Sequence, residues 1–542
     1  MLKDNIQYLP YQNLPNFSPF FWDYVAGNEK ALQFYNGNPF REEDWARIVS
    51  QRFVQNRDRS SLAGILSRQN NLFGYNELQQ RQIDRLKDSS TVVIITGQQA
   101  GIFSGPLYTI YKAITAIQLA QSLDKKGIPC VPIFWMETND HDFREIQTIG
   151  LFNNDNTPVQ INYNDPEIIE GTPVGNIQIS SRWGQFFHEL RSVIRESEFT
   201  SDIFRLINET YQPGRKFGEA FAFFMQRLFA PYGLILFDPM DAAVSSLTKN
   251  LIHRILDTEL QITAEVSEVT QQLLQQGYHA QVKIPEDSAH LFYNDNGRRL
   301  LLKRNSVWKY GETSASEREI GELVDNFPER FSPTVLTRPI FQDYLFPTIG
   351  YVAGPSEIAY WAQIKPLYAL LDISMPLVYP RASITLLEPK IAGLIEEYQL
   401  SMPQVLSGSE KLIREIMHRI VPESGEGTFN NFREDITTFC EQLFKMTEQV
   451  DKTLKGAVDT MREKTLFQVN KLQEKYDKAL EKKHTNVVEQ LKRITTHLLP
   501  QGKLQERELN ICSFFFRHGI ELIPHLMQTI PLNTSQHLLI SL

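Results

Sequence analysis

The sequence predicts an α/β protein in which a doubly wound parallel sheet, interrupted by insertions, is followed by a helical coiled-coil region. Three observations predict this class. A strand, glycine loop, helix and second strand begin at Thr91, and further strand-like runs return after polar stretches. From Phe432 onward, apolar residues recur in alternating steps of three and four, the period of a coiled-coil seam.

Length and composition indicate a multidomain globular protein. The chain has 542 residues, 42% of them hydrophobic and 22% charged, and it is too long for one compact core. The formal net charge of −9 argues against a dedicated nucleic-acid-binding protein, which would carry a concentrated basic patch. The first residues lack a signal-peptide pattern, and no apolar run is long enough to span a bilayer. We therefore expect a cytoplasmic protein that binds neither nucleic acid nor membranes.

The three cysteines, Cys130, Cys440 and Cys512, lie far apart in the sequence. Their number suits a reducing compartment and excludes a disulfide framework. They are also too few and too dispersed for a cysteine-rich zinc site, so we expect no structural zinc.

The first predicted strand is Thr91–Thr96, a continuous β-branched run typical of a strand buried on both faces of a parallel sheet. The loop GQQAGIFSG follows it, and a helical pattern then begins at Pro106, where proline is favoured and where Ser104 and Gly105 are suited to cap. A second strand, residues 128–136, ends in ETNDHDF. This βαβ unit predicts the start of a doubly wound domain.

Further strands are expected within residues 232–241 and 374–383, so insertions interrupt one sheet. The first insertion is polar and loop-rich, and the second contains FYNDNGRRLLLKR, whose Asp-Asn-Gly predicts a hairpin. The expected division is a first part of the core at 1–150, an insertion at 151–214, core again at 215–283, a second insertion at 284–331, the end of the core at 332–385, a helical coiled-coil domain at 386–500 and a C-terminal segment at 501–542.

Strand signals stop at Thr385, and Pro422–Gly427 is the clearest linker in the chain. The Lys- and Glu-rich stretch Phe432–Leu499 would be on the order of 100 Å long as one unbroken helix. Its apolar seam has to be buried, and we expect both an antiparallel helix of the same chain and a second subunit to cover it.

Three glycines, Gly97, Gly101 and Gly105, stand at four-residue spacing between the first strand and its helix. Such a loop lets backbone N–H groups and the helix dipole approach an anion, although it is neither a P-loop nor a G-x-G-x-x-G motif. The amides of Gln98 and Gln99 are suited to hydrogen-bond a polar substrate. The alternative is a tight turn in which glycine only satisfies backbone sterics.

Asp140, His141 and Asp142 follow the second strand, at the sheet edge where open α/β folds bind ligands. A histidine between carboxylates suits a general base, a substrate-orienting group or a metal ligand. A metal is the weakest of these because no second His or Cys stands at ligand spacing. The alternative is a solvated turn in which Asp140 caps a helix.

Three more segments carry candidate residues. Tyr351–Glu357 is a second glycine turn that opens a helix, where Glu357 serves either the site or only the helix dipole. Arg381, at the end of the last strand, is suited to clamp a carboxylate or phosphate, or else lies on the surface. Lys503–Glu508 forms a partner or nucleotide surface or a solvated helix start, and the following Phe514–Phe516 are expected in a core.

Five blocks occur in order along the chain: TGQQAGIFSGPLYTIYKAI, FWMETNDHDF, GYVAGPSEIAYW, VYPRASITLLEP and GKLQERELN. Together they resemble the bacillithiol biosynthesis cysteine-adding enzyme (BshC) family over essentially the whole length. The resemblance implies a Rossmann-like core similar to class I aminoacyl-tRNA synthetases, with 151–214 and 284–331 as connective-peptide insertions. It also implies a coiled coil that makes a homodimer.

The resemblance further implies a cysteine ligase that joins L-cysteine to the amino group of glucosaminyl malate, the last step of bacillithiol formation. By the synthetase analogy, ATP with magnesium would convert the cysteine carboxylate to an adenylate. The implied catalytic residues are His141, Asp142 and Gln99. The implied substrate- or nucleotide-binding residues are Gly97, Gln98, Gly101, Gly105, Tyr351, Glu357 and Arg381.

The sequence departs from the synthetases at three places. Gly105–Tyr108 replaces the HIGH histidines, Arg381–Thr385 replaces the KMSKS lysines, and no cysteine–histidine zinc set is present to select a thiol. These departures keep two alternatives open, a non-catalytic dimeric scaffold that binds a metabolite and an adenylate-forming ligase for another amino acid.

Overall fold

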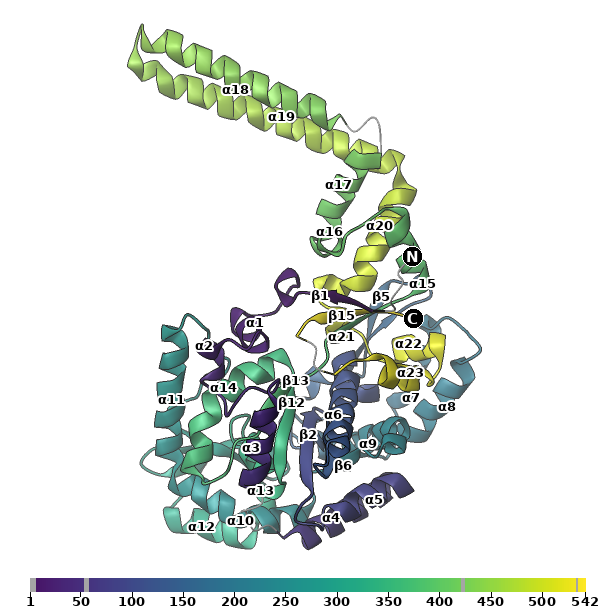
Figure 1. The fold of residues 1–542 in the computed structure, drawn as a ribbon, viewed down its shortest axis with the longest axis vertical. Coiled ribbons are helices and arrows are strands. Elements are labelled where there is room, and N and C mark those ends of the chain that lie inside the picture. Colours follow the sequence, from purple (N-terminus) through teal and green to yellow (C-terminus); the bar gives the residue numbers. More distant parts are fainter. Residues whose placement is uncertain (1–5, 53–57, 421–424, 533–534) are drawn as a thin grey trace. The chain divides into compact units, whose positions relative to one another are not determined.

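The computed structural model describes residues 6–52, 58–420, 425–532 and 535–542. The chain forms two compact units (Figure 1). The first contains residues up to Thr385 together with Lys503–Ile540, and the second contains Leu386–Gly502 with Ser541–Leu542. The first unit therefore takes up most of the C-terminal segment as well as the N-terminal part of the chain.

The first unit is built on a parallel sheet of five strands. They are β2 (Val92–Gln98), β3 (Cys130–Met136), β6 (Ile235–Phe237), β12 (Thr348–Ala353) and β13 (Leu377–Pro380). Their spatial order, β13-β12-β2-β3-β6, is that of a doubly wound Rossmann sheet, which confirms the predicted fold class. The order reverses between β2 and β12, so the switch point of the sheet lies between these two strands.

Strand β12 is the core strand that the sequence did not predict. Only a glycine turn was expected there, because glycines stand on both sides of Tyr351–Ala353, at positions 350 and 354. All six residues of β12 are nevertheless buried, since the strand is paired on both sides, with β2 and with β13. Tertiary pairing thus overrides the local turn signal.

Helices cover the faces of this sheet (Figure 1). Helix α3 (Glu42–Arg52) and helix α6 (Leu107–Lys125) share one buried cluster with four of the strands, and Trp45, Ala116 and Ile94 belong to it. Phe221 of α9 (Phe217–Phe229) packs on Phe134 with 5.9 Å between ring centroids. Helices α13 (Arg338–Leu345) and α14 (Pro355–Leu370) flank β12 in the sequence and carry polar residues to its end.

The first insertion is more helical than predicted. It begins on the hairpin β4 (Thr148–Phe152) and β5 (Pro158–Asn162), and it contains α7 (Trp183–Val193) and α8 (Thr200–Thr210). The aromatic residues of α7 supply the reason, because Trp183 and Phe186 are buried against Phe103 and Tyr163. Tertiary burial therefore stabilises helices whose polar flanks resemble loops in the sequence.

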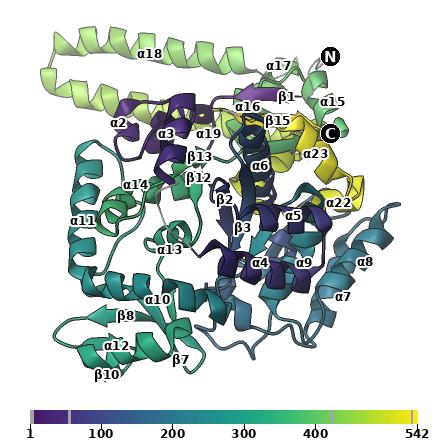
Figure 2. The ribbon, with the colours of Figure 1, turned by 60° about the horizontal axis from the view of Figure 1, so that its bottom comes forward.

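The second insertion forms an antiparallel sheet in the order β10-β9-β8-β7-β11, beside α10 (Ala242–Asp257) (Figure 2). Its elements are β7 (Ser288–Asp295), β8 (Arg298–Arg304), β9 (Trp308–Tyr310), β10 (Thr313–Ala315), α12 (Glu317–Asn326) and β11 (Phe331–Pro333). Asp295 pairs with Arg298 across Asn296 and Gly297, whose φ angles are 49° and 79°. The predicted hairpin is therefore confirmed, with the two positive φ angles of a type I′ turn.

The second unit is helical. Its helices are α15 (Pro389–Glu397), α16 (Met402–Leu406), α17 (Ser409–Ile420), α18 (Glu426–Glu448), α19 (Lys455–Lys483) and α20 (Thr485–Leu498). The stretch Phe432–Leu499 is not one unbroken helix, because the chain turns between α18 and α19 and again at His484. Arg433 donates to Asn470 at 3.1 Å, and the rings of Phe429 and Tyr476 lie 5.8 Å apart. These contacts confirm an antiparallel partner within the chain; residues 422–424 of the expected linker lie outside the described residues.

The C-terminal segment packs into the first unit. It contains α21 (Gln505–Glu508), α22 (Cys512–His518), α23 (Leu522–Thr529) and β15 (His537–Ser541). Phe514–Phe516 are buried, as predicted. Strand β15 lies between β1 (Ile6–Leu9) and β14 (Ile384–Leu387), so the expectation of no strand after Thr385 is wrong. A short edge strand of this kind gives too little periodicity to be seen in one sequence.

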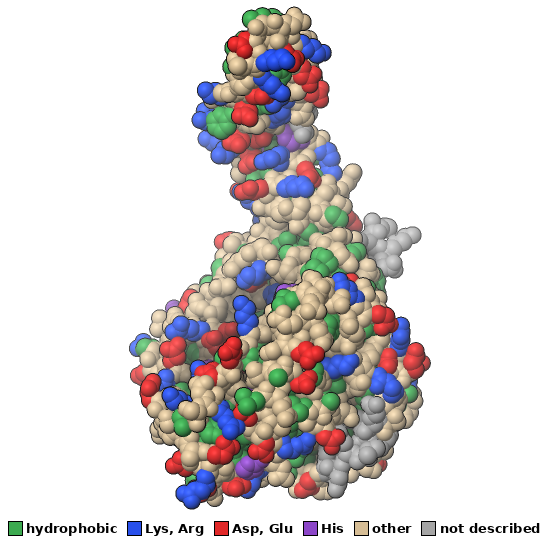
Figure 3. All heavy atoms as spheres, turned by 90° about the vertical axis from the view of Figure 1, so that its left-hand side faces the viewer, with side chains coloured by type: hydrophobic (Ala, Val, Ile, Leu, Met, Phe, Trp, Pro, Cys, Tyr) green, Lys and Arg blue, Asp and Glu red, His purple; other side chains and the backbone are tan. Residues whose placement is uncertain are grey.

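The surface carries both signs of charge. Over the face drawn in Figure 3, Lys and Arg side chains are interspersed with Asp and Glu side chains. Among the helices that the structure describes, none combines the length and apolarity needed to cross a bilayer.

Candidate active site

A cavity of about 580 Å³ lies at the carboxyl edge of the parallel sheet. Its wall contains residues at the ends of three strands: Gln98 is the last residue of β2, Glu137 follows β3 and Gly354 follows β12. Side chains of the second insertion, among them Phe292 and Arg299, complete the wall. Because β2 and β12 flank the switch point, the cavity occupies the place where open α/β sheets bind their ligands.

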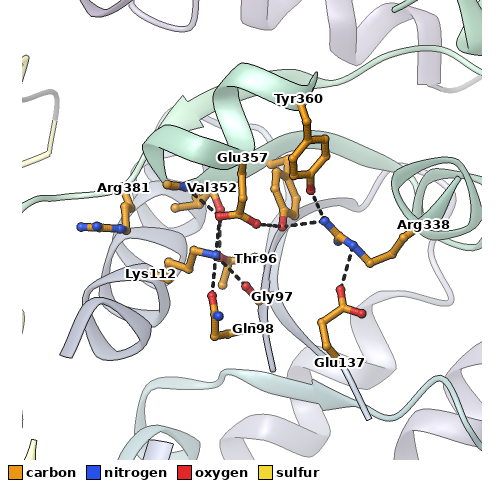
Figure 4. A network of polar contacts seen from close by, with 12 residues as sticks. Thr96, Gly97, Gln98, Lys112, Glu137, Arg338, Val352, Glu357, Tyr360 and Arg381 are labelled. Atoms are coloured by element: carbon orange, nitrogen blue, oxygen red, sulfur yellow. Dashed lines mark hydrogen bonds and ion pairs between the residues drawn. The ribbon is translucent and has the colours of Figure 1, made fainter. Parts of the chain in front are cut away.

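Lys112 ties the two strand ends together across the switch point (Figure 4). Its side chain is 3% exposed and donates to the Gly97 carbonyl at 2.8 Å and to Gln98 Oε1 at 3.0 Å. It also forms an ion pair with Glu357, which accepts the Gly354 backbone N–H at 2.8 Å. Glu357 therefore both caps helix α14 and belongs to the cavity wall, so the two interpretations of this residue hold together.

The Glu357 carboxylate stays ionised in this environment. Burial raises its pKa, but the charges of Lys112 and Arg338 outweigh burial and hold the pKa below its usual range. The Tyr351 hydroxyl donates to the same carboxylate at 2.6 Å. Tyr351 is thus fully buried behind the cavity and supports Glu357, rather than lining the wall as the resemblance implies.

Arg338 and Glu137 form a second ion pair (Figure 4). The Nε of Arg338 lies 2.8 Å from Glu137 Oε1, and its Nη2 donates to the hydroxyls of both Tyr351 and Tyr360. Burial raises the pKa of Glu137, and Arg338 offsets part of that rise. The pair places a carboxylate with a raised pKa at the end of β3.

His141 lines the cavity and is hydrogen-bonded to Arg299 of the second insertion, with 3.2 Å between His141 Nδ1 and Arg299 Nη1. A guanidinium has no acceptor, so Nδ1 accepts and the neutral ring carries its proton on Nε2. Burial, and then the charge of Arg299, lower the pKa of His141. Of the three predicted roles, this geometry favours a neutral, substrate-orienting Nε2–H group.

Arg299 is itself held firmly. Its Nε donates to Ser332 Oγ at 3.0 Å, its Nη2 donates to the Pro333 carbonyl at 2.6 Å, and its guanidinium lies 3.9 Å from the centroid of the Phe292 ring. Burial lowers the pKa of Arg299 to about 10, so it remains a cation at neutral pH. The second insertion thus sets the tautomer of a histidine that belongs to the core.

The two glutamines lie at the cavity, with half of each amide bound to the chain. Gln98 Oε1 accepts from Lys112, whereas Gln99 Nε2 donates to Asp140 at 2.5 Å and to Glu145 at 2.6 Å. No described residue hydrogen-bonds Gln98 Nε2 or Gln99 Oε1. These are the amide atoms that a polar substrate would meet.

Asp142 lies apart from the other predicted catalytic residues. It is exposed, is not part of the cavity wall, and accepts the Arg144 backbone N–H at 3.1 Å as the cap of a short 3-10 turn. The capping role expected of Asp140 therefore falls to Asp142. Asp140 itself lines the cavity, and its Oδ1 accepts the backbone N–H of His141 at 2.7 Å.

The glycine loop reaches the cavity only at its start. Gly97 lines the wall, but Gly101 and Gly105 do not. The loop turns inward instead, because the Asn510 amide donates to three of its carbonyls, including Gly105 O at 2.7 Å. A Cβ on Gly101 would lie 2.9 Å from the Gly105 Cα, so close backbone packing explains Gly101, whereas a φ of 72° explains Gly105.

The predicted capping of helix α6 is also different. The helix begins at Leu107, and Pro106 is its N-cap, without any side-chain cap. Ser104 has a left-handed backbone with φ of 78° and points into the interior, so neither it nor Gly105 caps the helix. Pro106 was expected at the first helical position, but it lies one residue before that position.

Arg381 is buried and pairs with a carboxylate of its own chain. Its Nη1 and Nη2 donate to the two oxygens of Glu506 at 3.0 and 2.7 Å, and Glu506 also accepts from Ser383 Oγ and the Ile384 N–H. The interpretation as a surface arginine is therefore wrong, as is a solvated helix start at Glu506. Arg381 was expected to bind a carboxylate, and the carboxylate that it binds in a bidentate manner is that of Glu506 in the same chain.

Several cavity residues were not predicted from the sequence. They are Lys112, Glu137, Arg299 and Arg338, whereas Arg507 belongs to the segment Lys503–Glu508, for which a nucleotide surface was one of the two expectations. Only Glu137 had a usable signal, because it follows the second strand in the same ETNDHDF stretch as His141. The others stand on helices or in the hairpin, where a single charged residue resembles any solvated one.

Together these features define a Rossmann-like α/β protein with a cavity at the switch point of its sheet, into which several charged side chains converge. The N-terminal Rossmann-like domain of bacillithiol biosynthesis BshC matches residues 5–382, and the C-terminal coiled-coil domain of BshC matches residues 384–542. The chain therefore belongs to the BshC family, as the resemblance predicted.

Curated relatives cover almost the whole chain. A Salinibacter ruber protein is 32% identical over 540 residues, with 97% of each chain covered. A Chlorobaculum tepidum protein is 31% identical over 550 residues with the same coverage, and a Geobacillus kaustophilus protein is 30% identical over 95% of this chain and 96% of its own. Each of the three is named "Putative cysteine ligase BshC".

Proposed function

We propose that the protein is a cytoplasmic ligase that adds L-cysteine to the amino group of glucosaminyl malate, the last step of bacillithiol biosynthesis, with ATP as co-substrate. Family membership and the names of the relatives support the ligase assignment. The observation that supports it in this chain is the cavity at the switch point, where carboxylates and cations from several segments of the first unit converge.

The cavity has groups suited to the anionic parts of these substrates. Lys112, Arg338 and Arg381 are already paired with carboxylates of the chain. Arg507 and Lys283 also line the wall, and the side chain of neither has an ion pair or hydrogen bond to any described residue. These two cations would hold a phosphate of ATP or a carboxylate of glucosaminyl malate. ATP with magnesium would supply the activation of the cysteine carboxylate that amide formation requires.

We also propose that the protein is a homodimer through its helical unit. Within that unit the hairpin of α18 and α19 exposes several large apolar side chains. They are Phe432, Phe439, Met446, Phe467 and Leu472, each more than half exposed. Exposed apolar residues of this number on one hairpin are typical of a protein interface.

The test is a reconstituted reaction. Purified protein is incubated with ATP, cysteine and glucosaminyl malate, each is omitted in turn, and products are followed by mass spectrometry. Bacillithiol with an equal amount of AMP is expected for an adenylate, whereas ADP would indicate an acyl phosphate. Product with serine in place of cysteine would favour a different amino-acid ligase. Ligand binding by calorimetry without any ATP consumption would favour the non-catalytic scaffold.

A further inference from the structure

Three carboxylates line the cavity, and two of them are fully engaged by the chain. Glu357 accepts from the Tyr351 hydroxyl through Oε1, and from the Gly354 N–H and Lys112 through Oε2. Asp140 accepts backbone N–H groups through Oδ1 and the Gln99 amide through Oδ2. Neither has an oxygen free of chain donors.

Glu137 is different. Its Oε1 accepts from Arg338 Nε at 2.8 Å, and no described residue donates to its Oε2. Figure 4 shows the carboxylate meeting Arg338 through one oxygen. Its side chain is 21% exposed, so the remaining oxygen is open to the cavity contents. Of the cavity carboxylates, Glu137 is the one with an oxygen left for a substrate.

Neither histidine of the cavity wall is placed to accept a proton. His290 is buried, its Nε2 lies 2.8 Å from Thr263 Oγ1, and burial lowers its pKa to about 4. His141 is held by Arg299 of the second insertion. Its Nδ1 lone pair is occupied by Arg299 at 3.2 Å, and its Nε2 carries the proton of the neutral ring. A proton released during the reaction therefore needs another acceptor in the wall.

Resting on the proposed function, we propose that Glu137 is the catalytic base that takes the proton from the attacking amine in the amide-forming step. The amine nitrogen attacks the carbonyl carbon of the ATP-activated cysteine, and a C–N bond forms. The bond from that carbon to the phosphate-bearing oxygen breaks, and the leaving group departs with the bonding electrons. The N–H proton passes to Glu137 Oε2, which later returns it to solvent.

The charges around Glu137 suit this role. Arg338 of α13 holds its Oε1 and fixes its orientation, Arg299 of β8 adds a second positive charge, and Asp140 and Glu357 face it with negative charge. Burial raises the pKa of Glu137 above its usual range, with Arg338 opposing and Asp140 adding to the rise. A carboxylate whose pKa is moved toward neutrality is a better base than an ordinary one.

The experiment compares two nucleophiles in the full-length protein. Glu137→Gln keeps the size of the side chain and removes its basicity, and Glu170→Gln is the matched control at a carboxylate that is 85% exposed. Amide formation with glucosaminyl malate is measured beside hydroxamate formation with hydroxylamine at high concentration. Hydroxylamine is an α-effect nucleophile that attacks activated acyl groups readily and releases its proton to solvent, so its reaction depends little on a base in the protein. Both reactions require ATP and cysteine.

For Glu137→Gln we expect kcat for the sugar amine to fall about 100- to 1,000-fold, with hydroxamate formation close to that of the unmodified protein. In the unmodified protein, kcat should fall at low pH as Glu137 becomes protonated, and this fall should be absent in Glu137→Gln. Glu137→Asp should recover part of the rate. Equal loss of both products would overturn the assignment, because it would mean that Glu137 serves activation or folding. Unchanged amide formation would overturn it as well.

The proposed function fails in a different way. If the unmodified protein forms neither amide nor hydroxamate, the ligase assignment falls, and the role of Glu137 falls with it. If it forms both products, the ligase stands whatever Glu137→Gln does.

Discussion

Removal of the Glu506 charge should destabilise the first unit strongly. Glu506 is fully buried, its partner Arg381 is 3% exposed, and the carboxylate accepts four hydrogen bonds. Glu506→Gln fills the same space but leaves the Arg381 cation without its counter-charge. Breaking a buried pair in this way costs about 3–5 kcal/mol.

Tryptophan fluorescence in urea measures this cost selectively. All six tryptophans precede Thr385, so their emission reports on the first unit and not on the helical one. The urea midpoint of Glu506→Gln should shift down by the amount that corresponds to about 3–5 kcal/mol. Asp202→Asn removes an exposed ion pair with Arg205 and should change the free energy of unfolding by less than about 1 kcal/mol.

Two further results follow from the same pair. Burial raises the pKa of Glu506, but Arg381 outweighs burial and the folded-state pKa lies below the usual range. The stabilisation should therefore be complete at neutral pH and be lost only as the pH falls through that lowered pKa. The apolar double variant Arg381→Met/Glu506→Leu should recover most of the loss, because no charge is left unpaired. A midpoint unchanged in Glu506→Gln would refute the reasoning.

Three other predictions test separate parts of the structure. Arg299→Gln should raise the pKa of His141, because the charge of Arg299 is the second cause, next to burial, that lowers this pKa. The pKa is measured by NMR titration of ¹³C-labelled histidine, and an unchanged value would mean that the contact is absent. Asn510→Ala removes the donor to three carbonyls of the glycine loop and should cost about 2–3 kcal/mol in the urea assay; a loss under about 0.5 kcal/mol would contradict that role. Leu472→Glu should yield monomers that keep their helices, as measured by light scattering and circular dichroism, since Leu472 is 60% exposed. Leu491→Glu should instead unfold the helical unit, because Leu491 is buried. A dimer that survives Leu472→Glu would place the interface elsewhere.

Much of the fold could be predicted because its signals are local. The buried strand at Thr91–Thr96, the Asp-Asn-Gly turn and the coiled-coil period each depend on residues close together in the sequence. Strands β12, β14 and β15 were missed because their stability comes from partners that are distant in sequence. The turn between α18 and α19 was not located, because the coiled-coil period continues through it and its residues carry no proline.

The site could be located but not resolved from the sequence. Motifs placed His141, Gln98 and Glu357 at one edge of the sheet, and the cavity is there. The state of each group depends on long-range partners, however. Arg299 comes from an insertion 158 residues away from His141, and Glu506 lies 125 residues from Arg381.

The sequence by itself therefore determined the class of fold, the family and the edge of the sheet where the cavity lies, because strand burial, turn chemistry and motif order are encoded locally. Only the tertiary structure decided which charged side chains form ion pairs within the protein and which remain for a substrate. The reason is electrostatic: whether a buried Arg381 or Glu137 is free depends on atoms within a few ångströms in space, and those atoms come from segments far away in the chain.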